Sequence, residues 1–407
     1  MDTGNTAWLL MSTGLVMFML PGLSLFYGGL VRRKNVLSTI MHSFFGLALV
    51  TIVWVIVGFS LAFGPSIGGL GLVGDPTTFA FFSGVGMEPS ATYATTVPFV
   101  LFAAFQLMFA AITPALITGA FAERKKFAAF VTFTVLWSLF IYSPLAHMVW
   151  SVDGWLFKLG ALDYAGGTVV HISSGVSALV AALMIGSRRK NGEKMDPHDV
   201  PMTVLGAGIL WFGWFGFNAG SAVAADGRAA MAFMVTTVAA AAGMVSWVGV
   251  QYARTQKVSV VGAAAGAVAG LVAITPASGF VGVGGALVIG LVVGGLSYLM
   301  AGLLRERLHV DDALDVFAVH GVGGMWGAVA TGIFAVAAIG GFPGLIEGDP
   351  EQLLFQVIAV VFTVAFAAIG TFLIMTFINV AFGARVTEEH EEIGLDLAVH
   401  GEAAYQI

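Results

Sequence analysis

Eleven apolar stretches run through this 407-residue chain, and each is about 20 residues long or longer. A helix of roughly 20 apolar residues spans the bilayer core of about 30 Å. We therefore expect an all-α polytopic membrane protein with eleven transmembrane helices. Their expected positions are near residues 5–31, 39–63, 97–121, 127–150, 164–187, 200–225, 229–253, 258–278, 281–304, 315–338 and 353–382.

The composition supports this class and excludes others. The chain is 58% hydrophobic and 10% charged, whereas a soluble globular domain carries roughly 25% charged residues. It contains no cysteine, which excludes disulfides, thiolate catalysis and cysteine-based metal sites. We expect no cofactor, no metal and no nucleic-acid partner. No basic residue precedes the first apolar stretch, so we expect no cleavable signal peptide.

The basic residues predict the orientation in the membrane. When the loops are assigned alternately to two sides, 15 of the 17 lysines and arginines fall on one side, and only Lys158 and Arg228 fall on the other. By the positive-inside rule the richer side is cytoplasmic. We expect a cell membrane (plasma or inner membrane) location with the N-terminus outside and the C-terminus in the cytoplasm.

A faint internal repeat relates two halves of the chain. The string GGTVVHISSG surrounds His171 and DVFAVHGVGG surrounds His320, and an aspartate, Asp163 or Asp315, shortly precedes each histidine. Five helices per half is an odd number, so the second half must be inverted, and inverted repeats place a substrate site near the midplane. The expected boundaries are a transmembrane domain at 1–382, with halves near 5–187 and 200–338 and helix 11 near 353–382, and a polar tail at 383–407.

The two histidines lie inside apolar stretches, where an ionisable group is a functional-site hypothesis by default. At 1.5 Å per residue, each lies roughly 8 to 10 Å from its own entry face. Counting therefore permits contact between His171 and His320 without establishing it. A lone membrane histidine is more often structural, but two at matched repeat positions favour function. His42 and His147 are unmatched, and we expect them to be structural.

Aromatic and small polar residues form the remaining candidates. Each has a structural explanation that needs no functional site. Phenylalanines at helical spacing commonly pack against each other, and tryptophans at helix ends commonly lie at the membrane interface. A serine can hydrogen-bond to its own helix backbone, and Asp163 or Asp315 can cap a helix. The candidates are Phe105, Phe109, Trp150, Trp214, Phe217 and Ser221.

Five longer strings resemble the Amt/Mep/Rh ammonium transporters, on the Amt side. In order along nearly the whole chain they are LFYGGLVRRKN, ALDYAGGTVVH, FGWFGFNAGSA, DVFAVHGVGG and EEIGLDLAVHGEAAY. The resemblance implies a homotrimer with one pore per subunit, formed between the inverted five-helix halves, and an eleventh helix along the outside.

The resemblance also implies roles for single residues. It assigns the outer ammonium-binding vestibule to Trp150, Phe109 and Ser221, of which Trp150 and Ser221 favour Amt over Rh. It assigns an aromatic gate to Phe109 and Phe217. It places His171, His320 and Trp214 in the pore behind the gate. It gives Asp163 and Phe105 structural positions near the site. One departure is the SVDG that follows Trp150, where the family usually has glycines.

The chemistry of ammonium explains this set of residues. Cation-π attraction supplies about 2 kcal/mol to a desolvated cation, whereas carrying an intact charge to the bilayer centre costs at least about 3 kcal/mol. Ammonium, unlike potassium, can leave its proton behind and cross as ammonia. Neutral imidazole both donates and accepts, so the two histidines suit a guide for ammonia or a relay for the proton. Whether net transport is electrogenic, and whether methylammonium passes, stays open.

An ammonium sensor on the same fold, signalling through its cytoplasmic tail, is the alternative function. An enzyme is not expected, because no P-loop, HExxH or nucleophile elbow is present. The resemblance further implies that the tail and the loop from Arg188 to His198 contact a PII-type nitrogen-signalling protein, of unknown identity, which would plug the cytoplasmic exit.

Overall fold

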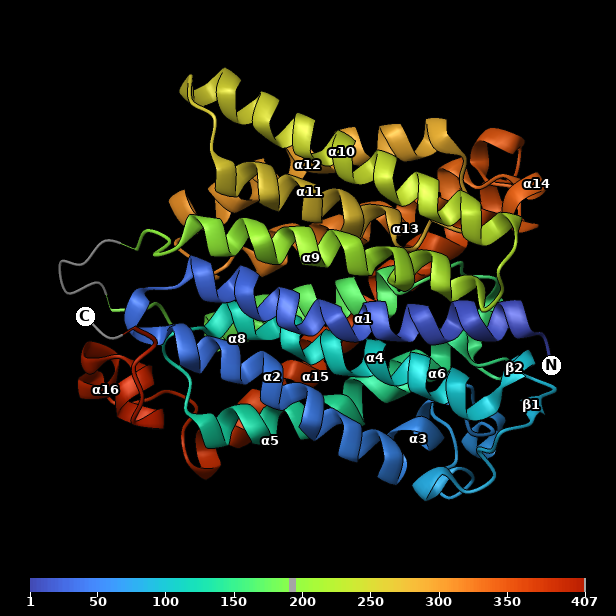
Figure 1. The fold of residues 1–407 in the computed structure, drawn as a ribbon, viewed down its shortest axis with the longest axis horizontal. Coiled ribbons are helices and arrows are strands. Elements are labelled where there is room, and N and C mark those ends of the chain that lie inside the picture. The colour runs from blue at the N-terminus through green and yellow to red at the C-terminus, as the bar shows by residue number, and fades with distance from the viewer. Residues whose placement is uncertain (190–194, 406–407) are drawn as a thin grey trace.

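The computed structural model describes residues 1–189 and 195–405, in which long helices run side by side between two ends of the molecule (Figure 1). Ten helical stretches of the described residues are long and apolar enough to cross a membrane, and α11 (Val260–Ile274) is a shorter apolar helix. This agrees with the eleven predicted segments. We call the end that carries Asp2 the amino-terminal face and the end that carries residues 383–405 the tail face.

The first half of the chain contributes eight helices and one small hairpin. Three of its helical stretches include π-helical turns, at Trp54–Gly58, Ser138–Tyr142 and Gly167–Ile172. The elements are α1 (Thr3–Leu30), α2 (Val36–Val53), α3 (Phe59–Phe63), β1 (Pro89–Ser90), β2 (Ala94–Pro98), α4 (Phe99–Ile117), α5 (Phe127–Trp137), α6 (Ser143–Trp150), α7 (Trp155–Leu159) and α8 (Ser173–Ile185). The strands β1 and β2 pair antiparallel.

The second half begins after the segment at 190–194. A π-helical turn at Phe317–Gly321 leads into α13, as the turn at Gly167–Ile172 leads into α8, and another lies in the tail at Asp396–His400. The helices besides α11 are α9 (Val200–Ala219), α10 (Gly227–Thr255), α12 (Val283–Glu306), α13 (Val322–Phe334), α14 (Ala337–Gly340), α15 (Pro350–Ala381) and α16 (Glu388–Ile393).

Short polar side chains start several of these helices at the ends of the bundle. Asp2, Asp226 and Ser259 each accept a hydrogen bond from a backbone N–H in the first turn. Such caps satisfy donors that have no partner within the helix. The polar residues at these ends of the apolar stretches therefore satisfy the backbone N–H groups of the first helical turn.

The first helices of the two halves, α1 and α9, lie against each other along the bundle (Figure 1). Gly206 of α9 makes this approach close, because a β-carbon there would overlap with the backbone nitrogen of Phe26 in α1. Small residues let membrane helices pack through their backbones. The pairing joins the two halves at the wall of the cavity described below.

The tail packs back onto the bundle at the tail face. Arg385 donates hydrogen bonds to the carbonyl oxygens of Ile185 (3.1 Å) and Ser187 (2.8 Å) at the end of α8. Asp396 accepts from the backbone nitrogens of Leu37 (3.1 Å) and Ser38 (2.8 Å) at the start of α2. The tail is therefore ordered against the helices up to residue 405, where Tyr405 contacts His198.

Candidate functional site

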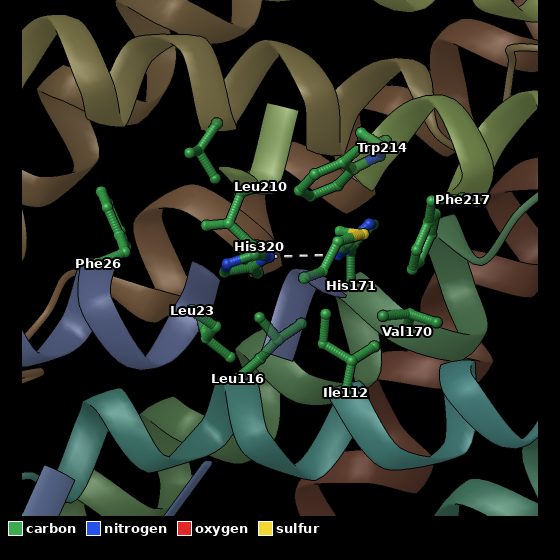
Figure 2. Close-up of a pocket in the computed structure, with 12 residues that line it drawn as sticks. Leu23, Phe26, Ile112, Leu116, Val170, His171, Leu210, Trp214, Phe217 and His320 are labelled. Carbon is green, nitrogen blue, oxygen red and sulfur yellow. Dashed lines mark hydrogen bonds between the residues drawn. The ribbon is translucent and has the colours of Figure 1, made fainter. Parts of the chain in front are cut away.

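His171 and His320 meet in the interior of the bundle (Figure 2). Their Nδ1 atoms are 3.2 Å apart and their ring centroids 5.3 Å apart. Both are buried, with 1% and 4% of their surface exposed. A hydrogen bond between two imidazole nitrogens needs one donor and one acceptor, so the pair holds one proton between its Nδ1 atoms. The contact that counting along the helices left open is present.

Each histidine lies in a π-helical turn, His171 in Gly167–Ile172 and His320 in Phe317–Gly321. The two helices run in opposite directions: from the central pair, α8 runs to the tail face, where Arg385 bonds the carbonyl oxygen of Ile185, whereas α13 runs towards the amino-terminal face (Figure 1). Gly175 of α8 touches the backbone of Gly321, and a β-carbon at Gly175 would overlap with the Gly321 nitrogen. The helices thus cross backbone to backbone beside the imidazoles, and single π turns of this kind often mark functional sites.

A narrow apolar cavity contains the histidine pair (Figure 2). Its volume of about 10 Å³ is close to the space that one water molecule needs. Its lining is apolar or aromatic apart from the two imidazoles: Met19, Leu23, Phe26, Ile112, Leu116, Val170, Leu210, Trp214, Phe217 and Val268. A molecule the size of ammonia or water fits this space, and a hydrated ion does not.

Stacked rings close this cavity towards the amino-terminal face. Phe217 lies 4.3 Å from Phe109 and 5.9 Å from His171, measured between ring centroids. Trp214 stacks on His171 at 5.5 Å, and its Nε1 donates to Thr275 Oγ1 (2.9 Å), which holds the indole in place. The aromatic side chains therefore form a continuous layer in front of the imidazoles.

Trp150 and Ser221 lie half-buried outside this layer. The Trp150 ring stands edge-on to Phe109 at 6.0 Å, and its Nε1 donates to the carbonyl oxygen of Asp163 (2.9 Å). The Ser221 hydroxyl donates to the carbonyl oxygen of Phe217 (2.8 Å), the own-helix bond that is the ordinary alternative for a helical serine. Its lone pairs stay available as acceptors.

Phe105, His42 and His147 have packing contacts. Phe105 packs against Phe109, with centroids 4.9 Å apart. His42 lies against Phe130 at 4.5 Å, and His147 Nδ1 contacts the carbonyl oxygen of Ala62 at 3.1 Å. These contacts are those of structural side chains.

Asp163 caps the turn that carries His171. Its carboxylate accepts from the backbone nitrogens of Gly166 (2.8 Å), Gly167 (2.5 Å), Thr168 (2.9 Å) and Val169 (3.2 Å), and from the Thr168 hydroxyl. Burial raises the pKa of this carboxyl, and the hydrogen bonds from Thr168 and Val169 oppose the rise. Both oxygens are occupied, so Asp163 acts as a fixed anchor.

The expectation that Asp315 caps the other histidine helix is wrong. Asp315 pairs with Arg305 (2.8 Å) instead, and Asp312 accepts from the Phe317 backbone nitrogen (2.7 Å). The reason is spacing: Asp312 stands eight residues before His320, as Asp163 stands eight before His171. Equal spacing is the sequence signal that could have identified Asp312.

A second, wider cavity of about 1130 Å³ opens at the tail face. It shares Phe26, Val268 and His320 with the narrow cavity, so the two meet at the second histidine. Asp312 lines its wall. Across residues 1–189 and 195–405, no group of three or more His, Cys, Asp or Glu residues could hold a metal ion.

Comparison with known proteins gives full-length matches. A model described as the Ammonium Transporter Family matches residues 7–405. An ammonium transporter of Bacillus subtilis (strain 168) is 48% identical over 100% of this chain and 99% of its own. The crystal structure of Saccharomyces cerevisiae Mep2 matches with a TM-score of 0.89 and 38% identity over 96% of this chain and 88% of its own. A structure described as a sensor Amt protein matches with a TM-score of 0.89 and 31% identity over 97% of this chain and 98% of its own.

Proposed function

Since this chain belongs to the ammonium transporter family, we propose that ammonium gives up its proton beside Trp150, Phe109 and Ser221 and then crosses as ammonia. The chain is a multi-pass membrane protein of a transporter family, not of an enzyme family. The observation that best supports this route is the narrow apolar cavity behind the aromatic layer, which contains two hydrogen-bonded histidines.

The energetics favour loss of the proton at the aromatic layer. Three rings at the amino-terminal end of the route, Trp150, Phe109 and Phe217, present π surfaces, which are worth about 2 kcal/mol to a desolvated cation. An intact charge at the bilayer centre costs at least about 3 kcal/mol, so the rings bind the cation without carrying it further. Potassium has no neutral form, and the same cavity therefore excludes it.

The histidine pair suits the passage of ammonia because it offers polar atoms without a charge. Its two Nδ1 atoms share one hydrogen bond. The His171 Nε2 atom is buried and has no hydrogen-bond partner in the described part of the chain, and His171 lines the cavity. A passing ammonia can bond to this atom, and a shared proton can move along the pair. We propose the pair as guide and relay.

The wider arrangement of the protein forms part of this proposal. The basic residues support a cell membrane location with the tail face in the cytoplasm and the N-terminus outside. We propose a homotrimer of subunits, each with its own pore between halves near 5–187 and 200–338, and methylammonium as a candidate second substrate. The regulatory tail, 383–407, and the open cavity beside it support docking of a PII-type protein. The loop expected to take part includes residues 190–194, which lie outside the described residues.

The direct test is current on a solid-supported membrane after an ammonium jump. We expect a saturable current in the wild type and its loss in His171→Ala and His320→Ala, because each substitution removes one side of the shared hydrogen bond. His309→Ala, at an exposed position in the wall of the wide cavity, removes a histidine outside the pair, so this control should keep a saturable current. Full current in both pair variants would contradict the relay.

The sensor alternative makes a different prediction in cells. A transporter supports growth of a transporter-deficient microbe on low ammonium, whereas a sensor binds ammonium without restoring growth. Correct insertion, ammonium binding and no growth would together favour the sensor.

A further inference from the structure

Asp163 and Asp312 occupy equivalent places in the two halves of the molecule. Each stands eight residues before a histidine of the central pair, and each caps the π-helical turn that carries that histidine. Asp312 lines the wide cavity at the tail face, whereas Asp163 is hydrogen-bonded to Trp150 on the other side of the pair. The bonding of the two carboxylates is nevertheless different.

Only one of the two carboxylate oxygens of Asp312 accepts a hydrogen bond from the described residues. Its Oδ2 accepts from the Phe317 backbone nitrogen (2.7 Å), whereas its Oδ1 is buried and has no hydrogen-bond partner within the described ranges. Only 6% of the residue is exposed. A buried carboxylate oxygen without a partner costs free energy unless it carries a proton or meets a ligand.

Asp312 lies in the wall of the route out of the narrow cavity. Asp312 and His320 line the same wide cavity, and His320 also lines the narrow one. A molecule that passes His320 towards the tail face enters a space with Asp312 in its wall. The carboxyl is therefore placed to meet ammonia after it has left the histidine pair.

The charges around Asp312 leave it able to carry a proton at neutral pH. Burial and the neighbouring Asp315 raise the pKa of its carboxyl to about 7, and the Arg124 guanidinium acts against the rise. Arg188 of the adjoining segment and Arg305 of α12 are bound to Asp311 and Asp315 (2.8 Å each). From α1, Tyr27 faces Asp312 with its hydroxyl donated to Leu116. No cation within hydrogen-bond distance of the Asp312 carboxylate is found in the part of the chain that the structure describes.

We propose that Asp312 is the acid that returns a proton to ammonia at the tail face, an inference that rests on the proposed function. The un-ionised carboxyl transfers its O–H proton to the lone pair of ammonia, which leaves a carboxylate and an ammonium ion. The carboxylate then takes up a proton from water in the wide cavity or from the histidine pair. Asp163 does not do this, because a proton on either oxygen would displace one of its donors.

Infrared titration of the purified protein tests the protonation step without transport. We expect a carboxylic C=O band that disappears with a midpoint near pH 7 in the wild type and is absent in Asp312→Asn. Asp315→Asn is the matched control, three residues away, and should keep a titrating band. A band at this pH that survives in Asp312→Asn would overturn the assignment.

Transport in proteoliposomes tests the role of that proton. In Asp312→Asn we expect the maximal rate to fall about tenfold, which is less than the roughly 10²–10⁴-fold that a general acid typically contributes, because water can substitute. The KM for external ammonium should stay within about twofold. The dependence of the rate on tail-side pH should also be lost, and Asp312→Glu should restore both. If Asp312→Asn does not fold, Asp312→Glu provides the test, because it should shift the midpoint of the dependence of the rate on tail-side pH.

The outcomes separate this inference from the proposed function. If the wild type shows no ammonium-dependent current or uptake, the proposed function fails. If the wild type transports and Asp312→Asn matches it in rate and pH dependence, only the role of Asp312 is overturned.

Discussion

The two ends of the central cavity are related in sequence but differ in chemistry. At the amino-terminal end, the Phe109 and Phe217 rings lie 4.3 Å apart and Asp163 has five donors on its two oxygens. At the tail end the cavity widens to about 1130 Å³ and Asp312 keeps a free oxygen. The same position is a fixed anchor in one half and a titratable group in the other. Symmetry of the fold therefore does not imply symmetry of function.

The largest expected difference between the two ends is in stability. Asp163→Ala leaves five buried donors without an acceptor, and each costs about 1–3 kcal/mol. We expect a loss on the order of 5 kcal/mol or more, or failure to fold. Asp312→Ala loses one backbone bond and should cost about 1–3 kcal/mol. Thermal unfolding in detergent measures both, and equal losses would break the comparison.

The next largest effect concerns the crossing that joins the two ends. Gly175→Ala forces a methyl group against the Gly321 backbone, and overpacking of this kind costs about 1–3 kcal/mol. Because the helices must separate there, the imidazoles should separate too, and ammonium current should fall strongly. Gly208→Ala, whose added methyl meets nothing within 4 Å, is the control. Normal current in Gly175→Ala would show that the crossing does not set the histidine contact.

A smaller effect is expected at the amino-terminal end alone. Trp150→Leu removes one π surface beside Phe109, worth about 2 kcal/mol to a desolvated cation. That value corresponds to a KM for ammonium raised about thirtyfold, with an unchanged dependence on tail-side pH. Uptake measured over a range of external ammonium concentrations tests this. An unchanged KM would remove Trp150 from the binding site.

The smallest effect is expected from the charge beside Asp312. Asp315 raises the pKa of Asp312 to about 7 together with burial, so Asp315→Asn should lower it. Since an acid loses its proton above its pKa, the variant should lose transport at a lower tail-side pH than the wild type. Its stability should change by less than about 1 kcal/mol, because the Arg305 side chain with which it pairs is largely exposed. A midpoint that moves to higher pH would contradict the assignment.

Much of the fold could be predicted from the sequence, because apolar length alone determines membrane helices. The shortest of them, α11, was still visible as an apolar stretch near 258–278. Two features could not be predicted. The first is the π-helical turns at His171 and His320, which give no periodic pattern in the sequence. The second is the contact between the two imidazoles, because helix ends predicted to within about 2 to 4 residues are too uncertain to fix the distance between them.

The misassigned aspartate has a physical explanation as well. Asp311, Asp312 and Asp315 lie within five residues, and the matching string DVFAVH begins at the third of them. Counting back eight residues from His320 singles out Asp312, and the structure shows how the three differ. Although burial acts the other way, the hydrogen bonds and charge of Arg188 hold the pKa of Asp311 below its usual range, Arg305 pairs with Asp315, and Asp312 alone keeps a free oxygen.

The most direct test of the central claim compares potassium with ammonium in the wild-type protein. If ammonium leaves its proton at the aromatic layer and the histidine pair relays that proton, an ammonium jump gives a saturable current on a solid-supported membrane and an equal potassium jump gives none. Equal currents from the two ions would contradict deprotonation as the source of selectivity, because potassium can cross only as a charge.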